Sequence, residues 1–224
     1  EFGDKRGVGT IYHNIGCIYD LKGNRHKALE NYKFNHEICK DYDDKGGMAV
    51  GYNNIGNIYY SAGDYDIAHK YIDNYLTLSE TIGDKGGIAA AFGNKSVYYR
   101  LQGNYDKGLD YLIRSYKINN DLGNNLAISV NYSSMGLLYI YCEEFENAED
   151  YIEKSLAIQK EIGISDNVRR LRNITSLALI YKILRKQYHT DEIQSLIKVT
   201  ENIDFELYYS LYQLLEDKTY LETA

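Results

Sequence analysis

The side chains best suited to catalysis or metal binding are scattered along this chain. Its five histidines and three cysteines do not fall at the spacing of metal ligands, since they form no HExxH or CxxC pattern. The sequence also contains no GxGxxG motif and no P-loop for binding phosphates. The paired carboxylates Asp43-Asp44 and Glu143-Glu144 fall in expected turns, where we expect them to cap helices. The sequence therefore predicts a protein that is not an enzyme, with no cofactor and no metal site.

A more informative pattern is a column of asparagines at Asn14, Asn54 and Asn94, which becomes a serine at Ser134. Asparagine is unfavourable inside a helix because its side chain competes for backbone hydrogen bonds, so its recurrence calls for a role. In a structural interpretation, each amide satisfies a carbonyl of the adjacent helix. In a functional interpretation, the amides bind the backbone of a partner, to which they can both donate and accept. The two roles are compatible, and the sequence leaves both open.

The asparagines are 40 residues apart, and the same step runs through most of the chain. It links the tyrosines Tyr19, Tyr59, Tyr99 and Tyr139. A fixed period of this length indicates an array of similar units, each too small to bury its own apolar face. Because these tyrosines fall on the helical core spacing, we expect them to pack between repeats.

One repeat contains two helical segments. Apolar residues follow helical spacing over 52–62 and again over 67–78, with Gly63-Asp64 between them. Glycine can end the first helix in a left-handed conformation, and the aspartate side chain can cap the second. The chain contains no proline, so we expect helices of about 18 residues joined by tight turns.

The residues that recur in these helices carry a family resemblance. The first helix has Tyr52, Ile55, Gly56 and Tyr59, and the second helix has Ala68. This pattern resembles the tetratricopeptide repeat, in the long variant of about 40 residues found in kinesin light chains and in Pins/LGN polarity adaptors. The resemblance covers residues 3–162 and departs from the family where a proline normally follows the second helix. It implies an all-α fold, a right-handed α-solenoid of antiparallel helix pairs.

Three segments follow from this register. Residues 1–162 are expected to form four hairpins of 40 residues, and residues 163–202 a degenerate fifth hairpin in which the register slips by two. Residues 203–224 are expected to form a C-terminal capping helix and tail, with one amphipathic helix over 204–221, because a stacked array needs an atypical last unit to cover its open end. Since the register begins only at Gly3, we expect the chain to be a fragment of a longer protein.

The resemblance also implies a binding surface, because in this family the first helices line a concave groove. The residues at these positions are mixed polar and apolar with little charge. They are His13, Asn14, Cys17, Val50, Asn53, Asn54, Asn57, Tyr60, Ala90, Gly93, Asn94, Val97, Arg100, Val130, Ser133, Leu137 and Tyr141. We expect them to bind a peptide or a partner helix. Chaperone-tail binding is not expected, because His13, Cys17, Ala90 and Asn94 occupy positions of the family's carboxylate clamp.

Two departures from the repeat stand out. In the third unit Lys95-Ser96 replaces the Ile-Gly pair and Gly108 replaces alanine; a helix-interior glycine costs about 1 kcal/mol, so we expect Gly108→Ala to raise the melting temperature. Near the start of the fifth unit lie Arg169, Arg170 and Arg172, where the helix dipole disfavours cations. They are either ordinary solvated charges or contacts for an acidic group on a partner or a neighbouring domain.

Composition limits the class of partner. The net charge of −7 argues against a nucleic-acid partner, which would need a basic face. No apolar run approaches the roughly 20 residues needed to span a bilayer. The three unpatterned cysteines favour unlinked thiols in a reducing, cytoplasmic location. We therefore expect a protein-binding scaffold; the alternative is a regulatory or dimerising region of a multidomain signalling enzyme such as a nucleotide cyclase or kinase, to whose sequences the C-terminal tail is weakly similar. Homo-oligomer formation is left open.

Overall fold

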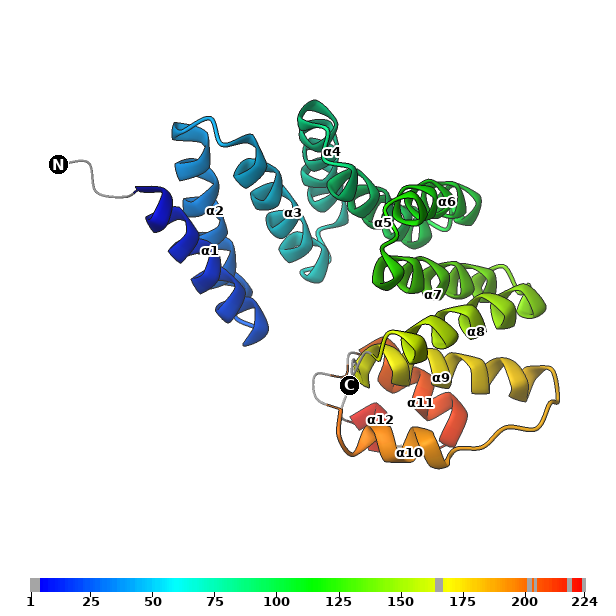
Figure 1. The fold of residues 1–224 in the computed structure, drawn as a ribbon. Helices are drawn as coiled ribbons and strands as arrows, with labels where there is room; N and C mark the ends of the chain where they lie inside the picture. The colour runs from blue at the N-terminus through cyan, green and yellow to red at the C-terminus, as the bar shows by residue number, and fades with distance from the viewer. Residues whose placement is uncertain (1–4, 164–166, 201–202, 204, 217–218, 223–224) are drawn as a thin grey trace. The chain divides into compact units, whose positions relative to one another are not determined.

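The computed structural model describes residues 5–163, 167–200, 203, 205–216 and 219–222 of the 224-residue chain. Over those residues the regular secondary structure is entirely helical (Figure 1). The helices are α1 (Lys5–Leu21), α2 (Arg25–Asp41), α3 (Lys45–Ser61), α4 (Tyr65–Ile82), α5 (Lys85–Leu101), α6 (Tyr105–Asp121), α7 (Asn125–Tyr141), α8 (Phe145–Glu161), α9 (Asn167–Ile183), α10 (Asp191–Ile197), α11 (Phe205–Leu215) and α12 (Thr219–Glu222). The predicted helix length is confirmed, since α3 has 17 residues and α4 has 18.

The turns between helices use the predicted left-handed residues. Gly63 and Gly83 have φ values of 85° and 70°, a conformation that costs glycine nothing. Asp43 and Glu143 adopt the same conformation with φ values of 52° and 61°, although they carry a side chain. The turn geometry is therefore kept where the glycine is lost.

The expected aspartate caps are only partly present. Asp44 and Asp84 accept hydrogen bonds from the backbone N–H groups of Gly47 and Gly87, at 3.0 and 2.9 Å. The prediction was wrong for Asp64, whose side chain makes no cap bond.

At Asp64 the backbone takes over the side chain's expected role, because the Ile67 N–H donates to the Asp64 carbonyl at 3.1 Å. Glu144 also lacks a cap bond, and its carboxylate instead accepts from the Asn147 side chain at 2.6 Å. Helix starts in this chain thus tolerate the loss of a side-chain cap.

The chain divides into two compact units, of which the first spans residues 1–118. Within it, α1 packs on α2 and α3 on α4 as antiparallel pairs, and the second helix of one pair packs on the first helix of the next. Gly56 allows the close approach of α3 and α4, because a Cβ there would lie 3.0 Å from Ile72 Cδ1. This is the helical hairpin that the repeat predicts.

The tyrosine column makes a contact that the sequence did not predict. Tyr59 stacks on Tyr71 of the same hairpin with ring centroids 5.6 Å apart, and Tyr99 stacks in the same way on Tyr111 at 5.4 Å. Tyr59 also packs in a cluster with Tyr19 of the preceding hairpin. The column therefore joins the two helices of a hairpin as well as consecutive hairpins.

The second unit spans residues 119–224 and contains α7 to α12. α7 packs on α8, α8 on α9, and α9 on α11, with buried Leu171, Leu207 and Leu211 in the last of these contacts. The second helix of the fifth hairpin, α10, has only seven residues.

The prediction of a single amphipathic helix over 204–221 was wrong. The segment forms α11 and α12 instead, because Glu216 has a φ of 59° and cannot continue a right-handed helix. The predicted start at Asp204 lies outside the described residues.

Candidate functional site

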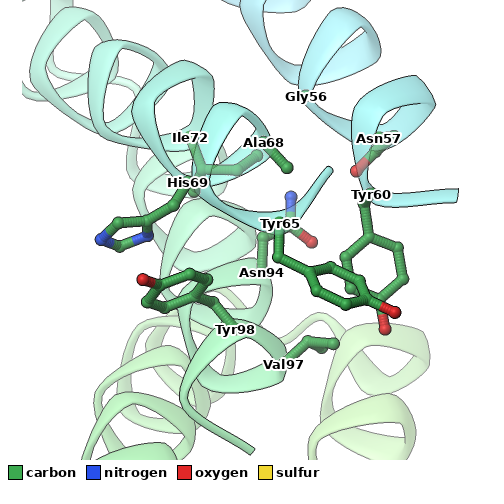
Figure 2. A pocket seen from close by; sticks show the side chains of 10 residues that line it. All are labelled: Gly56, Asn57, Tyr60, Tyr65, Ala68, His69, Ile72, Asn94, Val97 and Tyr98. Atoms are coloured by element: carbon green, nitrogen blue, oxygen red, sulfur yellow. The ribbon is translucent and has the colours of Figure 1, made fainter. Parts of the chain in front are cut away.

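Three helices of the first unit surround an open hollow of about 150 Å³. It lies where α4 meets α3 and α5 (Figure 2). Its lining consists of Gly56, Asn57 and Tyr60 from α3, Tyr65, Ala68, His69 and Ile72 from α4, and Asn94, Val97 and Tyr98 from α5. We call this site the tyrosine hollow. It brings together four predicted groove residues, namely Asn57, Tyr60, Asn94 and Val97.

Aromatic rings form two sides of the tyrosine hollow. His69 and Tyr98 stack with centroids 3.9 Å apart and planes 7° from parallel, while the rings of Tyr60 and Tyr65 lie 5.6 Å apart on the other side (Figure 2). Burial lowers the pKa of His69 below its ordinary value of 6.5, so the imidazole is neutral at pH 7. The lining therefore carries no net charge and suits an apolar or aromatic group.

Polar groups behind the stacked rings hold them in place. The Tyr98 hydroxyl donates to Asp66 Oδ1 at 3.3 Å, and His69 Nε2 lies 3.6 Å from Asp73 Oδ2. Asp73 also pairs with Lys95, which is only 7% exposed. His69 Nδ1 is buried and makes no hydrogen bond within the described part of the chain.

The asparagine column connects the first helices of consecutive hairpins. Asn94 Nδ2 donates to Asn53 Oδ1 at 2.9 Å, and Asn54 Nδ2 lies 3.4 Å from His13 Nδ1. The partners are side chains of the preceding repeat rather than the carbonyls that the structural interpretation named. Asn14, in the first hairpin, is exposed. The structural role thus has a geometric basis, and one member of the column, Asn94, also lines the tyrosine hollow.

Gly93 precedes Asn94 on α5 and has open space around it. A Cβ built on Gly93 would meet nothing within 4 Å, unlike Gly56, whose Cβ would press on Ile72. Gly93 and Val97 are four residues apart and share one face of the helix. Packing therefore does not require a glycine at this position.

The remaining predicted residues of the first unit lie elsewhere. His13 and Val50 line a second hollow of about 330 Å³ among α1, α2 and α3. Cys17 is half-buried and accepts a hydrogen bond from the Tyr32 hydroxyl at 3.5 Å. Arg100 is half-buried on α5.

In the second unit, predicted groove residues meet the chain's own C-terminal helix. Leu137 and Tyr141 line a hollow of about 560 Å³ among α7, α9 and α11, and the Tyr141 hydroxyl donates to Glu206 Oε1 of α11 at 3.0 Å. Ser133 donates to Asn173 of α9, which continues the pattern of polar bonds between first helices. Part of the expected surface here is thus in contact with α11.

The arginine run also finds acidic groups within the chain. Arg170 pairs with Glu192 of α10, and Arg172 Nη1 lies 3.5 Å from Glu206 Oε2 of α11. Arg169 is half-buried at the start of α9. Arg170 therefore links the two helices of the fifth hairpin, and Arg172 links the first of them to α11.

Sequence reasoning missed Tyr65, His69 and Tyr98, which complete the tyrosine hollow. It considered only the first helices as groove lining, so the contribution of α4 was overlooked. The signal was present in the repeat register: His69 replaces Leu29 and Leu109, and Tyr98 replaces an aliphatic residue found in the other hairpins.

Comparison with known families identifies the repeats. A tetratricopeptide repeat model matches residues 7–81, 47–121 and 87–161 in overlapping register. The chain belongs to the tetratricopeptide repeat family, as its sequence pattern predicts. No curated protein matches the sequence at a significant level.

Solved structures with the same fold come from several kinds of protein. A putative kinesin light chain with nearly identical repeats from Podosopora anserina is 13% identical with a TM-score of 0.63, and covers 97% of this chain and 100% of its own. A Rap protein complexed with competence and sporulation factor is 18% identical with a TM-score of 0.70, over 94% of this chain and 55% of its own. A signal transduction ATPase with a tetratricopeptide repeat sensor, from Pyrococcus horikoshii, is 20% identical with a TM-score of 0.68, over 98% and 32%. These likenesses confirm the predicted all-α fold of packed helix pairs.

Two further features bear on the class of site. Among the described residues, no cluster of three or more histidine, cysteine, aspartate or glutamate side chains is placed to hold a metal ion. No helix in the same part of the chain is both long and apolar enough to cross a membrane.

Proposed function

We propose that this chain is a non-catalytic scaffold that binds a peptide or a partner helix along the first helices of its repeats. The observation that carries the proposal is the tyrosine hollow, an uncharged site beside the amides of Asn57 and Asn94. Apolar pockets with a few well-placed polar groups are the usual form of a recognition site, and amides suit the backbone of an extended ligand. Tetratricopeptide repeats serve as protein-interaction modules, which supports a protein ligand over a small substrate.

A structural neighbour supports a peptide ligand in particular. The similar Rap protein was solved with competence and sporulation factor bound. The likeness concerns the fold, and the ligand of this chain is expected to differ because the identity is only 18%.

The test is a selection from a displayed library of random peptides, followed by affinity measurement on the enriched peptides. The double variant Asn54→Ala, Asn94→Ala should weaken binding about tenfold while circular dichroism shows unchanged helicity. Asn31→Ala is the matched control, because Asn31 is a half-buried helix asparagine, like Asn54 and Asn94, whose amide donates to the Lys27 carbonyl of its own helix.

Two results would contradict the proposal. A library that yields no peptide binding to the wild type removes its main support. Unfolding of the double variant would assign the asparagines to the stack and not to a ligand.

A second candidate is a regulatory region within a larger signalling enzyme, favoured by the likeness to the repeat sensor of the signal transduction ATPase. In that case the surface would contact a catalytic domain of the same polypeptide. Removing residues 1–224 from the full-length gene product would then change its enzymatic rate. An unchanged rate would contradict the regulatory role and favour the scaffold function.

A further inference from the structure

The tyrosine hollow has the size and lining of a site for one aromatic ring. Its volume of about 150 Å³ is comparable with that of apolar protein cavities, about 150 Å³, that accept benzene. Tyr60, Tyr65 and Tyr98 offer ring faces and edges, against which another ring packs favourably in offset or edge-to-face geometry. A charged side chain would find no opposite charge in the lining, since the His69 imidazole is neutral at pH 7.

Gly93, on the same face of α5 as Val97, provides a second and independent observation. A helix-interior glycine lowers stability relative to alanine, and here no neighbour demands one, because a Cβ would meet nothing within 4 Å. Glycine does allow another backbone to come close. One turn further along α5, Val97 borders the tyrosine hollow, so a chain passing Gly93 would reach the hollow with its next side chains.

We propose that the tyrosine hollow seats the ring of a phenylalanine in a bound peptide, whose backbone crosses α5 at Gly93. This inference rests on the proposed function and names the anchor of the ligand. Peptides selected on the wild type should share one phenylalanine. Replacing that phenylalanine with lysine should abolish measurable binding, and replacing it with leucine should weaken binding by about tenfold, or 1.4 kcal/mol.

Two variants test the two halves of the proposal. Val97→Phe places a ring of the protein's own at the wall of the hollow and should lower peptide affinity at least about tenfold. Val8→Phe is its control, since Val8 is an exposed valine of α1, 42% accessible, that does not line the tyrosine hollow. Gly93→Ala should weaken peptide binding while raising the melting temperature.

Gly86→Ala is the control for Gly93→Ala. It removes a second glycine from α5, at a position where a Cβ would make only an ordinary contact of 3.4 Å with Asp84. It should raise the melting temperature without affecting binding. If Gly93→Ala and Gly86→Ala have the same effect on affinity, the backbone does not cross at Gly93.

A direct probe separates this inference from the proposed function. In saturation-transfer NMR, N-acetyl-L-phenylalanine methylamide should receive signal from the wild type and lose it with Val97→Phe, while the corresponding lysine amide should receive none. Equal signals from the two amides, or a phenylalanine signal that survives Val97→Phe, would overturn the aromatic site. Enriched peptides without phenylalanine would do so too and leave the scaffold function standing. A failed peptide selection alongside a positive phenylalanine probe would instead remove the scaffold function and keep the site.

Discussion

The contact between the second helix of one hairpin and the first helix of the next is made by different kinds of side chain in the two units. In the second unit α8 packs on α9 through Ala148, Ile152 and Ile180, each at most 1% exposed. Partly buried Leu177 and Tyr181 complete this contact. The result is a closed apolar contact of the kind that holds repeat arrays together. Elsewhere between α8 and α9, the buried Asn173 amide donates to Ser155 Oγ at 3.0 Å.

In the first unit the equivalent contact of α4 with α5 is partly polar and open. Tyr98 stands where the second unit has Ile180, and Lys95 stands where it has Leu177. His69 adds an imidazole, and the tyrosine hollow opens beside the buried cluster of Ile72 and Tyr75 with Ala91. Lys95 and Tyr98 are paired with Asp73 and Asp66, but such pairs stabilise a buried contact no more than apolar packing does. Their presence therefore indicates a specialised surface and not a weaker copy of the repeat.

The largest expected effect comes from truncating the isoleucine that both interfaces have at the equivalent position, Ile152 in the second unit and Ile72 in the first. Ile152→Ala in the closed interface should lower the free energy of unfolding by about 2–5 kcal/mol. Ile72→Ala should cost less, because Ile72 already borders an open hollow and its removal creates little new enclosed void. Urea unfolding of both variants measures the difference. Equal losses would mean that the hollow is effectively closed in solution.

A smaller effect on stability is expected when the buried Lys95 is replaced with the residue type found at the equivalent position of the fourth hairpin. Lys95→Met introduces the residue that the fourth hairpin has at Met135. Replacing a buried ion pair with an apolar side chain is often neutral or stabilising, and we expect a gain of up to about 1 kcal/mol because Asp73 remains half-exposed to solvent.

Lys27→Met is the control for Lys95→Met, because Lys27 lies over the Tyr19 ring, 5.1 Å from its centroid, at the surface. We expect its effect to stay within about 0.5 kcal/mol. A loss of stability with Lys95→Met but not with Lys27→Met would show that the Lys95–Asp73 pair holds α4 against α5.

Much of the architecture could be predicted from the sequence, because the helix period and the turn residues act locally. Gly63 and Gly83 end helices by their own conformational preference, whatever surrounds them. The break at Glu216 could not be foreseen, since nothing in its residue type favours a left-handed conformation.

Only part of the candidate site could be predicted from the sequence. Asn57 and Val97 follow from the family's groove positions, but the hollow forms only when α4 brings Tyr65 and His69 against them. That contact depends on how the helices pack, which the period does not specify. Repeat positions at which one copy departs in chemistry, as at His69, are therefore the better guide to the site.

The third and fourth hairpins place the glycine at their helix crossing on different helices. In the fourth hairpin Gly136 faces α8, and a Cβ there would lie 3.2 Å from the Ala148 carbonyl oxygen. In the third hairpin the glycine is on the other helix, as Gly108, and the first helix has Ser96. We expect Gly108→Ala to stabilise the fold by about 1 kcal/mol through helix propensity, as thermal unfolding would measure.

The exchange of small residues supplies a control for Gly108→Ala. If the single variant instead lowers the melting temperature by several degrees, Ser96→Gly combined with Gly108→Ala should restore it. Restoration would show that the crossing accepts only one side chain. A double variant that stays destabilised would contradict the idea of an exchange.

The smallest expected effect concerns pH, and it depends on the imidazole that distinguishes the two interfaces. Burial lowers the pKa of His69 below 6.5 in the folded protein, so the unfolded chain binds a proton more readily. The unfolded state then holds more protons as the pH falls, and stability must fall with it below about pH 6.5. His36 is shifted in the same direction by burial and contributes a similar slope. His69→Leu, which restores the leucine of Leu29 and Leu109, should remove part of the slope between about pH 7.5 and pH 5 and leave the part due to His36. Urea midpoints across this range measure it, and a slope unchanged by His69→Leu would mean that the imidazole is not buried in solution and that the wall of the tyrosine hollow is open there.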